Sequence, residues 1–182
     1  MKKTLCALFF LVLTAVPVFA GTPESISKVY FDLLKNQTWD QIVPLYDRES
    51  LHEFREMMSF ILELPAEVEA QALPQFFGPG TTRESIKAMD DGVFFSSFLK
   101  SVMAQAAQLG QFDFKKIEVL GSVPEGTSLS HVVTRTEVSV GDISMESMEV
   151  ISFKKTETGW KILLQGKMKG IAQQIKNAMK QR

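Results

Sequence analysis

Three side chains that can carry charge or move a proton alternate along one predicted strand, the run SHVVTRTEVSV at residues 130–140. His131, Arg135 and Glu137 share one face of that strand with Val133, because successive side chains of a strand point to opposite faces. An imidazole can transfer a proton near neutral pH, and a guanidinium can hold an anionic ligand. One hypothesis is therefore a pocket lined by this face, in which Arg135 binds a small molecule and His131 exchanges a proton with it.

The alternative interpretation places this face of the strand in solvent or against a second subunit. The opposite face, which carries hydroxyls and valines, would then line the core; it comprises Val132, Thr134, Thr136 and Val138. We favour this interpretation, because regular alternation of polar and apolar residues is typical of half-exposed strands. A catalytic site would also need partners that converge on it from other parts of the chain.

A single carboxylate on the next predicted strand falls among apolar residues. Glu149 shares a strand face with Met145, Ser147, Ile151 and Phe153. Burial on that face would raise the pKa of Glu149 and allow it to act as an acid or a base. The opposite face, with Met148 and Val150, is also apolar, so the pattern leaves open which face is buried. The candidate ligand-binding residues are therefore Glu149, Arg135 and His131.

Other catalytic signatures do not occur in the sequence. Cys6 is the only cysteine, and His52 and His131 do not stand at a spacing typical of metal ligands. His52 lies among polar neighbours on a predicted helix, where exposure to solvent is the simpler interpretation. The sequence has no nucleophile elbow, glycine-rich phosphate loop or paired-carboxylate motif. We therefore expect no catalytic residue, no metal and no other cofactor.

The first twenty residues, MKKTLCALFFLVLTAVPVFA, predict a cleaved export signal. Lys2 and Lys3 form a positive start, an apolar stretch follows, and Val18-Phe19-Ala20 is typical of a cleavage site. The apolar stretch is short for a membrane span. We expect residues 1–20 to be removed, and residues 21–182 to form a single domain in the periplasm or outside the cell.

The charge balance of the chain argues against a nucleic-acid partner. There are 20 Lys and Arg against 21 Asp and Glu, so loss of Lys2 and Lys3 would leave a net charge of −3. The end of the chain, KMKGIAQQIKNAMKQR, is locally basic and predicts an amphipathic helix over 167–182. This helix could dock on an anionic membrane surface. We favour packing of its apolar stripe on the domain, with the lysines in solvent near the helix C-terminus.

The first part of the mature chain predicts helices. Capping residues mark three of the starts: Thr22 before Pro23, Thr38 in TWDQ, and Thr81 in TTRE. Apolar residues at helical spacing then predict helices over 22–36, 38–45, 50–64, 66–73, 81–89 and 90–108.

After Gly110 the hydrophobic period changes to that of strands. Four strands are predicted, over Phe114–Val123, Ser130–Val140, Ile143–Lys154 and Trp160–Gln165. Tight turns at Gly141-Asp142 and Glu157-Thr158-Gly159 require the strands that they join to pair antiparallel, as a meander in chain order. The sequence therefore predicts the α+β class.

Amphipathic helices followed by a meander with a Gly-Trp-Lys strand resemble the secreted bacterial members of the NTF2-like superfamily, also called cystatin-like or SnoaL-like. ESISKVYFDLLKNQTWDQIVPLYD at 24–47 resembles the opening helices, and FKKTETGWKILL at 153–164 resembles the last hairpin. The likeness covers most of residues 22–166. It implies N-terminal helices packed on a curved antiparallel meander, which form a cone with an internal pocket, and dimerisation through the sheet.

Two segments depart from a minimal member of that superfamily. One is a helical insert from Pro65 to Gln108, which could cover the mouth of the pocket, and the other is the basic terminal helix at 167–182. Ketosteroid isomerases and scytalone dehydratases of the superfamily use carboxylates, tyrosines or histidines in the pocket. No motif of this chain matches either set, so the resemblance transfers no catalytic residue.

The expected function is binding without catalysis. The exported protein would bind an apolar small molecule or a protein partner through the cone cavity or the open sheet face. The alternative is a small-molecule enzyme of the isomerase, dehydratase or hydrolase kind that uses Glu149, Arg135 or His131. The two hypotheses differ in one observable, because an enzyme needs at least two ionisable groups that face each other across a cavity.

Overall fold

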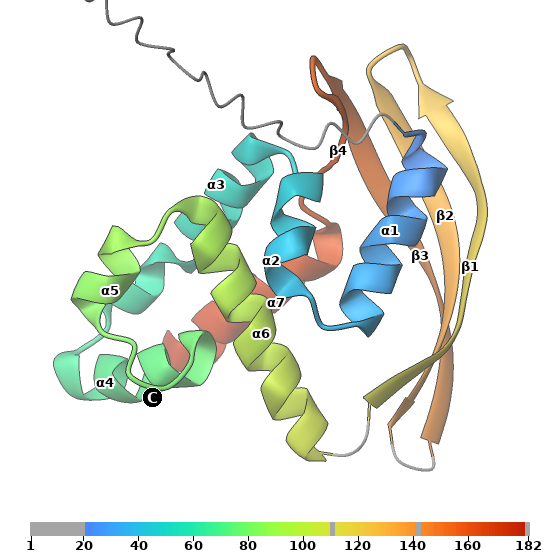
Figure 1. Cartoon of the computed structure of the whole chain (residues 1–182). Helices are drawn as coiled ribbons and strands as arrows, with labels where there is room; N and C mark the ends of the chain where they lie inside the picture. The colour runs from blue at the N-terminus through green and yellow to red at the C-terminus, as the bar shows by residue number, and fades with distance from the viewer. Residues whose placement is uncertain (1–20, 110–111, 141–142, 181–182) are drawn as a thin grey trace, which may run out of the picture.

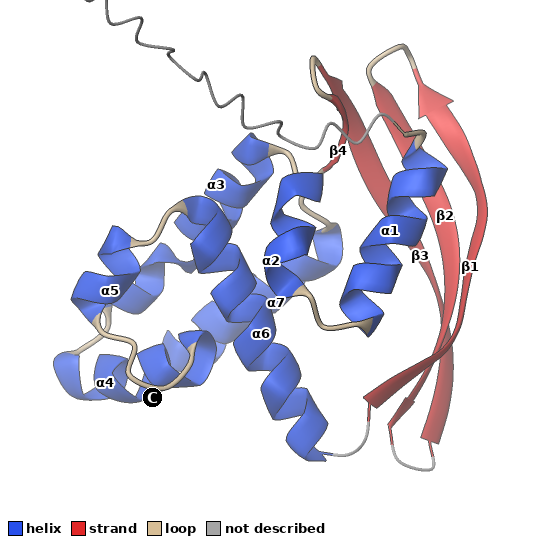
Figure 2. Ribbon diagram, viewed as in Figure 1, coloured by secondary structure: helices blue, strands red, loops and turns tan. Residues whose placement is uncertain are grey.

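The computed structural model describes residues 21–109, 112–140 and 143–180. Within these ranges the chain forms two layers, a group of helices on one side and a curved sheet on the other (Figures 1 and 2). The α+β class predicted from the sequence is confirmed, as are the N-terminal helices packed on an antiparallel meander. The predicted export signal and the turn at Gly141-Asp142 lie outside the described residues.

The first helix begins at the cap that the sequence predicts, whereas the capping box predicted at Thr38 does not form, because the Thr38 hydroxyl donates to Leu33 O instead. The Thr22 hydroxyl accepts a hydrogen bond of 3.3 Å from the backbone N–H of Ser25, at the start of α1 (Pro23–Lys35). α2 (Trp39–Ile42) follows Thr38 and passes into a short 3-10 turn, η1 (Val43–Leu45), which contains Pro44. Figure 1 places α1 directly against the sheet and α2 between α1 and the other helices.

The helix predicted over 50–64 is two elements in the structure. α3 (Arg48–Met58) begins after Asp47, whose carboxylate accepts a hydrogen bond of 3.4 Å from the backbone N–H of Ser50. The chain then tightens into a 3-10 segment, η2 (Ser59–Glu63), and becomes extended at Leu64. The physical reason for that stop is Pro65, because the residue before a proline is disfavoured in the helical conformation.

The helical insert contains α4 (Ala66–Phe77), α5 (Arg83–Ala88) and α6 (Asp91–Leu109). The cap of α5 is Thr82 and not the predicted Thr81, because the Thr82 hydroxyl and the Ser85 side chain form a reciprocal capping box. The sequence predicts that α4 ends at Leu73, but the helix continues through Pro74 to Phe77. Phe76 stacks on Phe98 and Phe77 packs on Phe94, so both additional aromatic residues are held by α6. This packing outweighs the hydrogen bond that a proline removes from a helix.

The sheet is the predicted meander, with strand order β1-β2-β3-β4 and antiparallel pairing throughout. Its strands are β1 (Phe112–Glu125), β2 (Leu129–Val140), β3 (Ile143–Thr156) and β4 (Gly159–Ile162). β4 is shorter than the predicted strand over Trp160–Gln165, because the chain leaves the sheet after Ile162. β4 consequently pairs only with Phe153–Thr156, at one end of β3.

The helices cover the sheet face that carries Val132, Thr134, Ile151 and Phe153, each of which is fully buried. Large aromatic side chains of the helical layer fill the space behind this face. The centroid of the Phe54 ring lies 5.1 Å from that of Phe95 and 5.1 Å from that of Phe98. The structure therefore settles which face of β2 and of β3 is turned inward. It is the hydroxyl and valine face of β2 and the Glu149 face of β3.

The terminal helix, α7 (Gly166–Lys180), packs on α3. Ala172 on its apolar stripe is buried, Lys169 pairs with Glu53 at 2.6 Å, and the Lys176 ammonium lies 5.8 Å from the centre of the Phe60 ring. Among the helices of the described residues, none has the length and apolar character that crossing a membrane requires.

Candidate functional site

A groove of about 390 Å³ runs between the free edge of β3 and the start of α7. Its β3 wall comprises Ser147, Met148, Glu149 and Val150, and its other wall comprises Gln165, Gly166 and Lys167. We call this hollow the β3-edge groove. It contains Glu149, one of the three ligand-binding residues predicted from the sequence.

The groove exists because β4 is too short to cover β3. Ser152 O accepts a hydrogen bond of 2.8 Å from Leu163 N on the β4 side, and Lys155 N donates one of 2.7 Å to Ser128 O on the other side. Main-chain groups of a strand alternate between its two edges, so those of Met148 and Val150 face the same edge as those of Ser152. No strand of the described chain pairs with β3 at that edge before Phe153. The N–H and C=O groups of Met148 and Val150 are therefore available to another extended chain.

Exposed apolar side chains gather on this unpaired part of β3. The seven large hydrophobic residues that are exposed in the described chain include four from β3: Ile143 (66%), Met145 (55%), Met148 (60%) and Val150 (56%). Ile143 and Met145 lie on the inner face, where the helices leave them exposed, and Met148 and Val150 lie on the outer face. An edge strand that is apolar on both faces and lacks a neighbour is a typical site for pairing with another chain.

Glu149 is held in the groove by an ion pair. Its Oε1 lies 2.7 Å from the Lys167 ammonium, and its side chain is one quarter exposed. Behind it lie Tyr30 and Tyr46, whose hydroxyl oxygens are 3.5 Å apart. Burial raises the pKa of Tyr30 and, more strongly, that of Tyr46, and the charge of Glu149 also raises the pKa of Tyr30. Both phenols are therefore uncharged at neutral pH, and the charged groups of the groove are Glu149 and Lys167.

One polar group of the groove is only weakly paired. The side-chain amide nitrogen of Gln165 is buried and forms no hydrogen bond of ordinary geometry within the described chain, but it lies close enough to the Tyr30 hydroxyl to lower the pKa of that phenol. A buried amide that is poorly paired can donate a better hydrogen bond to a new acceptor. Gln165 also lines the groove, so a carbonyl oxygen of a bound chain could accept this hydrogen bond.

The other two predicted residues lie on the outer face of the sheet. His131 Nε2 is 2.7 Å from Glu125 Oε2, and its Nδ1 is 2.9 Å from Ser152 Oγ. Arg135 lies 3.6 Å from a Glu118 oxygen and 3.5 Å from a Glu146 oxygen. The sheet separates these side chains from Glu149, so the structure does not bring the three candidates together in one pocket.

Two further polar residues singled out in the sequence, His52 and Glu137, are paired with other side chains in the structure. His52 pairs with Asp91 at 3.1 Å, and Arg55 of the same helix donates to Ile86 O at 3.0 Å and so fixes the end of α5 against α3. Glu137, the third polar residue of its strand face, accepts a hydrogen bond of 2.8 Å from Ser144. Across the described ranges no three His, Cys, Asp or Glu side chains cluster in a way that could hold a metal ion.

Sequence reasoning missed Lys167, Gln165 and the free edge itself. The sequence did contain a signal for the edge. Both faces of the strand that starts at Ile143 carry a mixture of polar and apolar residues, so the strand lacks the regular alternation of a strand with one buried face. The prediction of a fourth strand as far as Gln165 concealed it, since such a strand would have placed Gln165 inside the sheet.

No family model matches the chain, and no curated protein matches its sequence. Two solved structures resemble it. The solution structure of a SEC-C motif containing protein from Rhodopseudomonas palustris is 15% identical over 78% of this chain and 75% of that one, with a TM-score of 0.42. The crystal structure of a protein described as an NTF2-like transpeptidase from Campylobacter jejuni is 11% identical over 80% of this chain and all of that one, also with a TM-score of 0.42. At this level neither likeness bears on what the chain does.

Proposed function

We propose that the mature chain is an exported binding protein that captures an extended segment of a protein partner in the β3-edge groove. The segment would add to the sheet as a further strand beside β3. The observation that carries this proposal is the stretch of β3 edge that no strand of the described chain covers, next to a groove of about 390 Å³. Strand addition uses main-chain hydrogen bonds for affinity and alternate side chains for specificity.

The groove indicates the chemistry of the partner. The main-chain groups of Met148 and Val150 would pair with the backbone of the added segment, and Gln165 would donate to one of its carbonyls. The apolar side chains exposed on both faces of β3 favour a segment whose apolar residues also occur on both faces. Glu149 is already paired with Lys167, so the site makes little demand for a charged residue in the segment.

The enzymatic alternative requires ionisable groups that converge on a bound molecule. In the β3-edge groove Glu149 and Lys167 bind each other at 2.7 Å, while His131 and Arg135 lie on the far side of the sheet. These positions favour binding over catalysis. The proposed site is the free edge of β3, which differs from both the cone cavity and the open sheet face that the sequence led us to expect.

The test is a peptide-display selection on residues 21–182, followed by affinity measurements with the selected peptides. We expect peptides with closely spaced apolar residues, and N-methylation of alternate peptide nitrogens should abolish binding because it removes main-chain donors. The variant Val150→Pro removes one edge N–H at a position where an edge strand tolerates proline, and should weaken binding at least about tenfold.

The matched control is Val123→Lys, which changes an equally exposed residue on the outer face of β1 and should leave peptide affinity unchanged. Peptides that bind Val150→Pro as well as they bind the parent, or a selection that yields no peptide, would contradict the proposal. Light scattering adds a third outcome. A dimer that Val150→Pro dissociates would assign the edge to a second copy of this chain and overturn the proposal of a foreign segment.

A further inference from the structure

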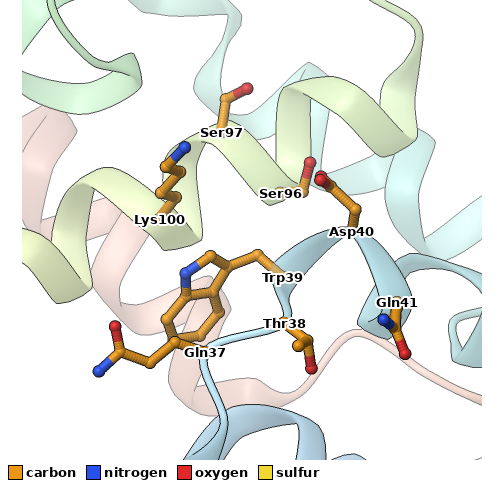
Figure 3. Close-up of a pocket in the computed structure, with 8 residues that line it drawn as sticks. All are labelled: Gln37, Thr38, Trp39, Asp40, Gln41, Ser96, Ser97 and Lys100. Atoms are coloured by element: carbon orange, nitrogen blue, oxygen red, sulfur yellow. The ribbon is translucent and has the colours of Figure 1, made fainter.

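A second hollow, of about 470 Å³, lies in the helical layer between the start of α2 and the middle of α6. We call it the α2–α6 groove. Figure 3 shows Asp40 near Ser96 at one end of it and Gln37 and Lys100 at the other, with the Trp39 ring between the two ends. None of the residues that line it also lines the β3-edge groove.

Two opposite charges of the α2–α6 groove are not neutralised by the protein. Asp40 and Lys100 are both exposed, and neither has an ion-pair partner within 4.0 Å among the residues the structure describes. They also do not pair with each other, although they line the same groove. A single molecule that carries a cation at one end and an anion at the other would satisfy both.

The indole N–H of Trp39 adds a donor beside Lys100. Trp39 is only 8% exposed, but its ring nitrogen is not among the buried side-chain atoms that lack a partner in the described chain, so its N–H is open to the groove that the residue lines. In Figure 3 this nitrogen lies on the Lys100 side of the ring. Buried tryptophans usually place this donor against an acceptor. Here the indole N–H and the flexible side chain of Lys100 both line this end of the groove and could turn toward a carboxylate.

The backbone at Gln37 is unusual for its residue type. Gln37 N donates to Leu34 O at 3.1 Å and Thr38 N donates to Leu33 O at 3.0 Å, a pattern that ends α1 with a residue at positive φ. Gln37 has φ 55°, whereas glycine is the usual residue there. A glutamine in this strained conformation puts an amide at the Lys100 end of the groove, where it could also bind a carboxylate.

From these positions we propose that the α2–α6 groove binds a short zwitterionic peptide, such as a dipeptide. Its carboxylate would contact Lys100, the indole N–H of Trp39 and the amide of Gln37, and its ammonium would contact Asp40. Asp40 and Lys100 lie at opposite ends of the groove. This arrangement suits a peptide better than a single α-amino acid, because the two charges of an amino acid flank one carbon atom. The volume of the groove lies in the range of small-molecule sites.

The test follows the indole N–H resonance of Trp39 by NMR during titration with dialanine, and assigns it with Trp160→Phe. We expect a saturable shift of the Trp39 resonance. N-acetyl-dialanine and dialanine amide each lack one charge and should bind at least about tenfold more weakly. Asp40→Asn should weaken dialanine to about the level of the acetylated peptide, and Lys100→Met should weaken it to about the level of the amide.

Matched controls separate this proposal from general charge effects and from the β3-edge groove. Asp32→Asn on α1 and Lys87→Met on α5 change exposed charges outside both grooves and should not alter the affinity. Val150→Pro should also leave it unchanged, so the two sites can fail independently. No shift of the Trp39 resonance, equal affinity for blocked and free peptides, or loss of binding in Val150→Pro but not in Asp40→Asn would each overturn the proposal.

Discussion

The two ends of β3 lie in opposite surroundings. At one end, Phe153–Thr156 pairs with β4 and Phe153 is fully buried. At the other end, Ile143, Met145, Met148 and Val150 are each more than half exposed. Both ends pair with β2 in an uninterrupted register, so β2 does not cause the difference. It arises from the length of β4 and from how far the helices extend over the sheet.

This contrast shows that the burial of a strand residue depends on its neighbours more than on its own side chain. A valine or methionine on an edge strand is stable in solvent when the rest of the domain supplies the core. Such residues are also where other chains can pair, which is why we propose the free end of β3 as the site of recognition.

The largest expected effect lies at the covered end. Phe153→Ala should lower the free energy of unfolding by about 3 to 5 kcal/mol, because it empties a fully buried site. Urea denaturation followed by circular dichroism measures the change. A loss below about 1 kcal/mol would mean that the helices do not pack on this end of the sheet as described.

Amide hydrogen exchange compares the two ends directly. Met148, Val150 and Lys154 present their N–H groups to the same edge of β3, but only Lys154 has β4 beside it. We expect the amides of Met148 and Val150 to exchange fast and that of Lys154 to be protected, because exchange requires the hydrogen bond to open. Equal protection at the three positions would show that the edge is covered in solution.

A pH-dependent contact anchors the covered end to α3. The hydrogen bond and charge of Lys154, 2.7 Å away, hold the pKa of Glu49 below 4.5. A carboxyl whose folded pKa is lowered adds stability above its unfolded pKa and loses it as the pH falls through its folded pKa. In Lys154→Met the pKa of Glu49, followed by NMR titration, should rise toward 4.5. An unchanged pKa would show that the pair does not form.

The smallest effect on stability is expected at the free end. Met148→Lys changes a residue that is 60% exposed and should alter the free energy of unfolding by no more than about 0.5 kcal/mol. The same denaturation experiment checks it. A clear destabilisation would show that Met148 packs against something that the described chain does not contain, and a second copy would then be the first partner to examine.

Much of the fold could be predicted from sequence because its signals are local. Thr22 and Pro23 mark the start of α1 within a few residues, and the short turn around Gly159 requires the strands beside it to run antiparallel. Predictions failed where distant packing decided. α4 continues past Leu73 because Phe94 and Phe98, on α6, hold its last aromatic residues.

The candidate site was less accessible to prediction than the fold. Glu149 could be singled out because a carboxylate among apolar residues is visible in the sequence, but its partner Lys167 lies on a different element. His131 and Arg135 were grouped with Glu149 because all three are ionisable. Only the pairing of Thr134 with Glu149 shows that Glu149 and Arg135 lie on opposite faces of the sheet.

The sequence by itself determined the α+β class, the order of the strands and the cap of the first helix, since each follows from periodicity or turn chemistry within a short window. The tertiary structure alone decided which sheet face is buried, where β4 stops and which side chains meet at the β3-edge groove. The reason is that both faces of β3 are apolar, so its local pattern fits either orientation. Its burial is set by contacts with residues such as Phe54 and Phe95, which are distant in sequence.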